Sequence, residues 1–177
     1  MINKPKYKVA RRLGPHVFEK TQTQKFALRG ASVGPARVWK RGKSRTEFGN
    51  KILEKQRART IYGVNEKQFT TYVKDIAGER GINRAEALMA KLESRLDNVV
   101  FRMGLANTRQ ASRQLVSHGH IAVNGRRVNI PSYNVKKDDR ITIPERSHKS
   151  KLFVNLEEKY KTYTCPSWMT FDAAKKT

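Results

Sequence analysis

Two arginines one helical turn apart are the clearest candidates for binding chemistry in this sequence. Arg109 and Arg113 fall on one face of an expected helix, where each planar guanidinium can donate paired hydrogen bonds to phosphate oxygens. Gln114 and His118 lie nearby and can reach a sugar hydroxyl or the edge of a base. These residue types at this spacing indicate a surface that binds a polyanion, and nucleic acid is the first candidate.

Further basic side chains occur in two other places. The first is a stripe along one face of an expected helix, at positions i, i+4 and i+8, formed by Lys51, Lys55 and Arg59, with Arg57 beside it. The alternative is that this face is an ordinary solvated surface. An expected hairpin and the loop after it contribute Asn124, Arg126, Arg127, Lys136 and Lys137. Because RNA is recognised mainly through its shape, phosphates and ribose hydroxyls, a convex basic surface favours RNA over the DNA major groove.

The overall charge agrees with a polyanionic partner. The 177 residues contain 38 Lys+Arg against 15 Asp+Glu, a net charge of +23 with histidine neutral. Such an excess opposes compaction unless a polyanion is nearby, and an anionic membrane surface is the second candidate. Residues 1–60 hold 17 basic and 3 acidic side chains, residues 61–93 hold 5 of each, and residues 94–146 hold 10 and 4. We therefore expect a neutral scaffold between two basic surfaces.

Other kinds of chemistry lack the residues that they need. Cys165 is the single cysteine, so we expect neither an internal disulfide nor a cysteine-based zinc site. The histidines show no metal-ligand spacing, and no nucleophile–base pair indicates an enzyme. No stretch approaches the roughly 18 apolar residues of a membrane span, and the first thirty residues lack the apolar segment of a signal peptide. The sequence predicts no metal, no cofactor and no membrane partner.

The elements that position these residues follow from apolar spacing and capping residues. Residues 1–43 show little periodicity and predict a basic extended arm with at most one short helix. Ser44 and Glu47 form a potential capping box, which predicts a helix from Ser44 to about Tyr62. The next helix is expected after Asn65, because apolar residues then recur at i, i+3, i+4, i+7 and i+8.

That helix is expected to end at Gly81, after which Asn83 and Glu86 form a second capping pair. Helical spacing then continues to Gly104, which predicts two helices that meet near residues 93–94.

Residues 94–146 predict a separate small α+β unit, too small for a catalytic cleft. Its second helix is expected to start at residue 107 or 108, with Ala111, Leu115 and Val116 facing inward. Asn124-Gly125 is the strongest short signal for a hairpin. A last strand is expected over residues 140–143.

Several motifs in this order resemble one family. RLDNVVFRMG at 95–104, TRQASRQLVSH at 108–118 and VNG at 123–125 closely resemble the RNA-binding domain named after small-subunit ribosomal protein four. EKQ, YGV and EKQF between residues 54 and 69 resemble the same protein outside that domain, as do PSY at 131–133 and PSW at 166–168. The resemblance covers roughly residues 36–172.

The resemblance implies an α+β fold in which a helical domain carries an inserted small RNA-binding domain of two helices plus a small antiparallel sheet. The implied divisions are a basic extended N-terminal arm (1–43), a helical domain (44–93), the inserted domain (94–150) and a C-terminal helical return to the first domain (151–177). It also implies a structural protein of the small ribosomal subunit, located on a cytoplasmic ribosome, with an organellar ribosome left open.

The family's role implies early binding to the 5′ domain of small-subunit ribosomal RNA, nucleation of subunit assembly and contact with small-subunit protein five. It also implies that the chain lines the messenger RNA entry path together with proteins three and five. On the rRNA face the resemblance places Arg109, Arg113, Gln114, His118 and His120. Toward the messenger path it places Arg37, Lys40, Arg41, Lys43 and Arg45.

This sequence departs from the family in two ways. It lacks the N-terminal four-cysteine zinc site of some members, and it stops at Thr177, before the family's usual tail, which implies a reduced contact with protein five. Two alternatives carry the same small domain. An enzyme, such as a pseudouridine synthase or a tRNA synthetase, needs a catalytic domain for which 177 residues leave no room. A free-standing RNA-binding stress factor lacks the motifs of residues 54–69.

Overall fold

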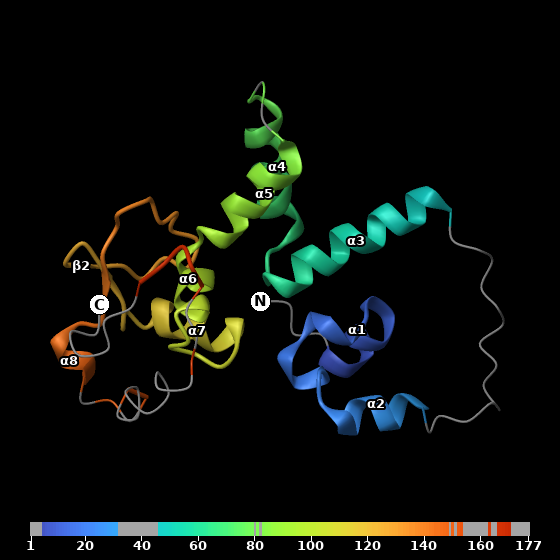
Figure 1. Cartoon of the computed structure of the whole chain (residues 1–177), viewed down its shortest axis with the longest axis horizontal. Helices are drawn as coiled ribbons and strands as arrows, with labels where there is room; N and C mark the ends of the chain where they lie inside the picture. Colours follow the sequence, from blue (N-terminus) through green and yellow to red (C-terminus); the bar gives the residue numbers. More distant parts are fainter. Residues whose placement is uncertain are drawn as a thin grey trace. The chain divides into compact units, whose positions relative to one another are not determined.

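Figure 1 shows the computed structural model, which describes residues 5–31, 46–79, 81, 83–148, 150, 152–153, 163 and 166–170. The chain forms two compact units, residues 1–71 and 72–177. The first is helical, and the second combines helices with a three-stranded antiparallel sheet. The predicted α+β class is confirmed.

The N-terminal segment is helical rather than extended, so the prediction of an arm with at most one short helix is wrong. It contains α1 (Lys6–Leu13), the 3-10 helices η1 (Pro15–Val17) and η2 (Glu19–Thr21), and α2 (Gln24–Ala31). Ala10 and Leu13, three residues apart on α1, are buried, and so is Val17 of η1. Tyr7 also stacks on Phe26, with ring centroids 5.8 Å apart. The many basic residues between these apolar positions concealed the pattern.

Helix α3 (Glu47–Ile61) starts later than the capping box predicted. Its N-cap is Thr46, whose hydroxyl accepts a hydrogen bond from the Gly49 amide at 3.2 Å. Ser44 lies outside the described residues. The predicted end is confirmed, because Gly63 adopts a left-handed φ of 62° directly after the C-cap.

Helices α4 (Glu66–Ala77) and α5 (Arg84–Glu93) have the predicted caps. Asn65 accepts from the Gln68 amide at 2.8 Å, and Asn83 both accepts from the Ala85 amide and donates to Glu86. Helix α4 ends four residues before Gly81, the predicted terminus. A backbone bond from Glu79 to the Ile76 carbonyl makes the turn that ends it.

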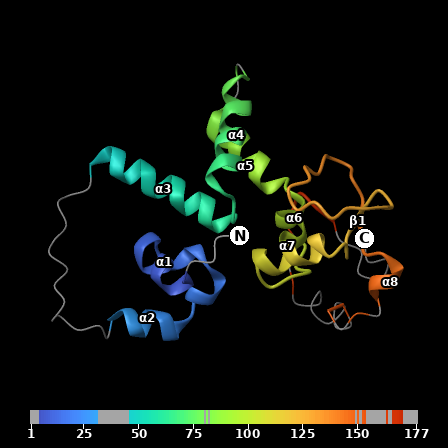
Figure 2. The same cartoon turned by 180° about the vertical axis from the view of Figure 1, so that it is seen from behind.

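The second unit contains the small fold that the sequence predicted. Helices α6 (Leu96–Arg102) and α7 (Arg109–Ser117) lie side by side in both Figure 1 and Figure 2. They are followed by β1 (Ala122–Val123), β2 (Arg126–Arg127), β3 (Ile141–Thr142) and the short helix α8 (Glu145–His148). The sheet order is β2-β1-β3, both pairs antiparallel, with Val123 opposite Arg126 and Ile141. The start of α7 at Thr108 and the hairpin at Asn124-Gly125 are confirmed.

The core of this fold is apolar and fully enclosed. Its most buried side chains are Leu96, Val100, Val116, Ile121 and Phe153. The prediction that Ala111 faces inward is wrong, since Ala111 is exposed and the next residue, Ser112, is fully buried. The Ser112 hydroxyl donates to the Asp97 carbonyl at 2.6 Å, which satisfies a polar group in that position. Most of the predicted C-terminal return, 151–177, lies outside the described residues.

Candidate RNA-binding surface

A buried carboxylate in α6 holds one of the two predicted phosphate-binding arginines. Arg113 donates through Nε and Nη2 to Oδ2 of Asp97, at 2.9 and 2.6 Å. Arg95 donates to both oxygens of the same carboxylate, at 3.1 and 2.8 Å, and through Nη1 to the Tyr72 hydroxyl. Asp97 and Arg95 are each only 3% exposed. The carboxylate therefore fixes the plane of Arg113 on the surface of α7.

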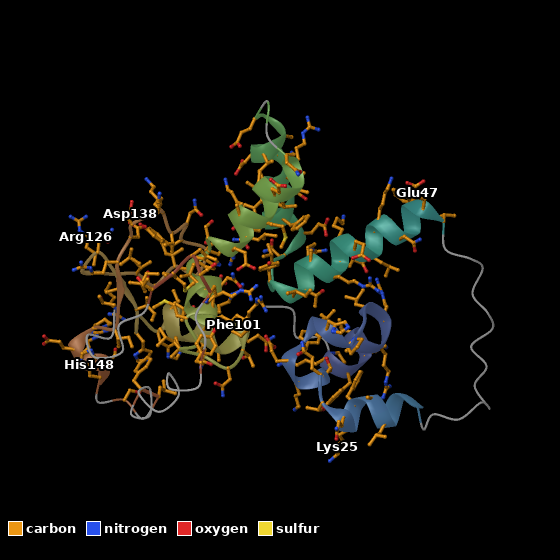
Figure 3. The ribbon with its side chains drawn as sticks, in the orientation of Figure 1. Lys25, Glu47, Phe101, Arg126, Asp138 and His148 are labelled. Carbon is orange, nitrogen blue, oxygen red and sulfur yellow. The ribbon has the colours of Figure 1, made fainter. Side chains whose placement is uncertain are left out.

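Arg109, the second predicted arginine, is also held by α6. Its Nε donates to Oδ1 of Asn98 at 2.9 Å, and its guanidinium lies 4.4 Å from the ring centroid of Phe101. That distance is within the range of a cation–π contact. Figure 3 labels Phe101 among the side chains of the second unit. Both arginines are thus oriented by the neighbouring helix, while parts of their side chains stay accessible.

Both arginines of the hairpin are exposed, and one of them also caps a helix. Arg126 is exposed on β2 and points outward in Figure 3. Arg127 donates to the carbonyls of Gly119 and His118, at 3.1 and 3.0 Å, at the C-terminal end of α7. A cation there is favourable, because carbonyls at a helix end carry partial negative charge. Arg127 can approach this closely because residue 119 is a glycine: a Cβ added there would lie 1.9 Å from the Arg127 Nε.

Asn124 links the hairpin to the following loop. Its side chain donates to Asp139 at 2.8 Å and accepts from the Arg140 amide at 2.9 Å. Asp139 also accepts from the Lys136 amide, and this bond, followed by the one from Asn124, lowers the pKa of the Asp139 carboxyl. The side chains of Lys136 and Lys137 are exposed on this braced loop.

Gln114, His118 and His120 come together around a small cavity. They line a space of about 310 Å³ beside α7 whose apolar wall includes Leu105 and Leu115. Gln114 and His118 are exposed, whereas His120 is half-buried, near Ser147 Oγ at 3.0 Å and edge-on to Phe153. Burial, followed by the charges of His118, Arg146 and Arg127, lowers the pKa of His120.

The basic stripe of α3 is ion-paired within the chain. Lys51 pairs with Glu47 at 2.6 Å, and Arg57 pairs with Glu54 at 2.5 Å. Lys55 at 2.8 Å and Arg59 both pair with Glu66. The hydrogen bond from Lys55, with the charge of Arg59 beside it, lowers the pKa of Glu66. All four predicted cations of this stripe therefore have a carboxylate partner.

The five predicted residues nearest the messenger path lie outside the described residues. They are Arg37, Lys40, Arg41, Lys43 and Arg45. In the part of the chain that the structure describes, no cluster of histidine, cysteine and carboxylate side chains is suited to a metal ion. Nor is any described helix both long and apolar enough to cross a membrane.

Sequence reasoning missed the residues that position the surface. The motif at 95–104 that carries the family resemblance includes Arg95, Asp97 and Asn98. Nothing in their spacing shows that they orient the arginines of α7. The first turn of α6 is itself fixed by the loop before Asn134, because the amides of Leu96 and Asp97 donate to the carbonyls of Tyr133 and Pro131. Such contacts depend on the folded chain.

Comparison with known proteins gives a consistent family. The model described as "Ribosomal protein S4/S9 N-terminal domain" matches residues 2–93, and the model described as "S4 domain" matches residues 94–141. The chain is 42% identical over 157 residues to small ribosomal subunit protein uS4A of Alkaliphilus metalliredigens, covering 89% of this chain and 75% of that protein. It is 41% identical over 174 residues to protein uS4 of Halothermothrix orenii, covering 97% and 83%.

Proposed function

Because this chain belongs to the ribosomal protein S4 family, we propose that it is a structural protein of the small ribosomal subunit and binds the subunit's RNA. The observation that carries the proposal is the exposed polar and basic surface of the small fold, formed by α7, the hairpin and the loop at 136–137. The similar proteins are named as ribosomal proteins, which are structural, so the chain is not an enzyme.

The surface combines two kinds of contact with RNA. Arg126, Lys136 and Lys137 are exposed cations suited to phosphates, and their contacts are independent of base sequence. Arg109 and Arg113 are preorganised by α6, so they lose less conformational freedom when they bind a phosphate oxygen. The polar groups around the small cavity are placed to contact ribose hydroxyls and unpaired bases.

The finer assignment rests on the family resemblance. We propose that the RNA is the 5′ domain of small-subunit rRNA, that binding is early and nucleates assembly, and that proteins five and three are neighbours near the messenger entry path. The basic segment 37–45 and the stripe of α3 would face that path and the adjoining rRNA. The place of action is then the ribosome of the cytoplasm or of an organelle.

Fragment binding tests this proposal. The full chain should bind a transcript of the 5′ domain in the absence of other proteins, and more tightly than transcripts of the other small-subunit rRNA domains. Equal affinity for all domains would reduce the proposal to general RNA binding. The double variant R126Q/K137Q should lower the steepness of log K against log salt by about 2, since each phosphate contact contributes about 1. The matched control is K67Q/K74Q, which removes two exposed lysines from the charge-neutral block.

A further inference from the structure

An acidic residue directly before the small fold lies behind one of the two arginines of α7. We propose that Glu93, the last residue of α5, is a positioning residue for Arg109: it fixes the amide of Asn98, and that amide holds the arginine. This inference rests on the proposed function, since the ligand of Arg109 is a phosphate of the small-subunit RNA.

The carboxylate of Glu93 accepts hydrogen bonds from two side chains of α6. Arg102 donates to both oxygens, from Nη2 to Oε1 at 2.8 Å and from Nε to Oε2 at 3.1 Å. This paired contact fixes the plane of the carboxylate. Oε2 also accepts from Nδ2 of Asn98 at 2.5 Å. The Glu93 side chain is 22% exposed and Asn98 is only 2% exposed, so the bond between them is shielded from water.

The Asn98 amide satisfies its partners in one orientation only. Its Nδ2 donates to the Glu93 carboxylate and, at 3.3 Å, to the main-chain carbonyl of the same residue. Its Oδ1 accepts from Nε of Arg109 at 2.9 Å. The reverse orientation would bring the amide oxygen against the carboxylate, and the amide N–H groups against the N–H of the arginine. A buried polar group without a partner is costly, so Glu93 ensures that an acceptor faces Arg109.

This contact holds the charged end of Arg109 in a defined place. The guanidinium lies 4.4 Å from the ring centroid of Phe101, and the bond through Nε fixes its rotation above that ring. A guanidinium held in this way loses less conformational freedom when it binds a phosphate oxygen. Arg113 is held by a different acid, Asp97, so the effect of Glu93 should be confined to Arg109.

Loss of Glu93 should act in the opposite sense to charge alone. Removal of an acid from a chain of net charge +23 strengthens its attraction to RNA. Removal of Glu93 should instead weaken binding, because Arg109 loses its fixed position. Two variants of equal charge separate the effects. Glu93→Met (E93M) keeps the length of the side chain without either oxygen, whereas Glu93→Gln (E93Q) keeps one oxygen that can accept from Asn98.

The first test measures the affinity of the full chain for the 5′-domain transcript at one KCl concentration. E93M should bind about 3- to 10-fold more weakly than the wild type, up to the contribution of one hydrogen bond to a charged group, and E93Q should bind more tightly than E93M. The control E79Q, which removes an exposed acid of the same unit, should bind no more weakly than the wild type. In an R109Q background, E93M should cause no further loss. Circular dichroism verifies that each variant is folded, and E93A replaces E93M if that variant does not fold.

Nuclear magnetic resonance of the free protein tests the positioning without RNA. The Nε–H proton of Arg109 should exchange with water more slowly than that of Arg126, which is exposed on β2, because it is hydrogen-bonded to a buried amide. E93M should raise the exchange rate at Arg109 and leave the rate at Arg113 unchanged, since Asp97 holds that side chain. An unchanged rate at Arg109 in E93M overturns the inference.

The binding experiment can overturn the inference in three ways that leave the proposed function standing. E93M binds as tightly as the wild type while R109Q binds weakly, so that Glu93 does not position the arginine. E93M causes the same loss with and without R109Q, so that Glu93 acts on the fold as a whole. R109Q binds like the wild type, so that Arg109 contacts no phosphate. If the wild type itself fails to bind the transcript, the proposed function fails and the inference falls with it.

Discussion

At the scale of single residues, the arginines that look most suited to RNA are also part of the fold. Arg113 and Arg95 share the carboxylate of Asp97, which is almost completely buried. A buried ion pair adds little net stability over an apolar replacement, but the loss of one partner leaves an uncompensated charge in a medium of low polarity. The positions of these side chains therefore depend on one acid.

Replacement of that acid should be strongly destabilising. We expect Asp97→Ala to lower the free energy of unfolding by about 3–5 kcal/mol, because the buried guanidinium of Arg95 loses its counter-charge. Arg113→Gln should cost clearly less, since the Arg113 side chain is 23% exposed and can be replaced at the surface by water. Urea denaturation followed by circular dichroism measures both changes. Equal costs for the two variants would contradict the central role of Asp97.

The lowered pKa of His120 predicts a dependence of stability on pH. Burial is the main cause, and the neighbouring charges of His118, Arg146 and Arg127 act in the same direction. The unfolded chain binds this proton at a higher pH than the folded chain, so unfolding takes up a proton below about pH 6.5. Titration of His120 therefore leaves the free energy of unfolding unchanged above neutrality, and it lowers that free energy as the pH falls through about 6.5.

The measurement is the free energy of unfolding at pH 7.5 and at pH 5 for the wild type and for His120→Gln. We expect the wild type to lose more stability between these two values than the variant loses, because glutamine cannot bind the proton. Parallel losses would show that the folded and unfolded states hold this proton equally well.

At the scale of elements, locally determined features were predicted and features set by tertiary contacts were not. The caps at Asn65, Asn83 and Thr108 and the turn at Asn124-Gly125 depend on neighbouring residues, and the structure has them all. The helical nature of residues 6–13 was missed, because apolar contacts with η1 and η2 stabilise a segment whose sequence is dominated by charge.

The candidate site shows the same division. The sequence identified the exposed cations of the hairpin and loop, such as Arg126 and Lys137, from residue type and position alone. It could not show that Lys55 and Arg59 pair with Glu66, since Glu66 belongs to the next helix. The other two pairs of α3, Lys51–Glu47 and Arg57–Glu54, are at the local spacings i, i+4 and i, i+3. Ser112 lies inside because it precedes the buried Leu115 and Val116 by three and four residues on the same helix face. The apolar pattern did not mark it because serine is polar, and its hydroxyl is satisfied only in the fold, by the Asp97 carbonyl.

The packing of α6 against α7 should dominate the stability of the small fold. Leu96 has no exposed surface and belongs to the core between these helices and the sheet. Leu96→Ala should cost about 2–5 kcal/mol of unfolding free energy, through lost apolar burial and the cavity that remains. Met89→Ala on α5 is the matched control, because Met89 is 50% exposed, and its cost should stay below about 1 kcal/mol. Equal denaturation midpoints for Leu96→Ala and Met89→Ala would mean that the core closes around the smaller side chain at position 96.

At the scale of the whole molecule, the net charge of +23 is the dominant electrostatic fact. Some cations are neutralised locally, as on α3, but most of the excess has no acidic residue to offset it, so the folded chain repels itself. The repulsion is long-ranged at low ionic strength and is screened over about 10 Å at 0.1 M salt. Binding to RNA would relieve the same repulsion more completely.

Salt should therefore stabilise the chain in the absence of RNA. Between 20 and 300 mM KCl we expect the melting temperature to rise by roughly 2–4 °C, which corresponds to about 1 kcal/mol for a chain of this size. Exposed pairs such as Lys51–Glu47 oppose this effect, but each contributes little. Differential scanning calorimetry measures the rise. The quadruple variant K8Q/R11Q/R126Q/K137Q, with a smaller charge excess, should show a smaller rise. A melting temperature that falls with added KCl would mean that internal ion pairs, and not self-repulsion, govern the stability of this protein.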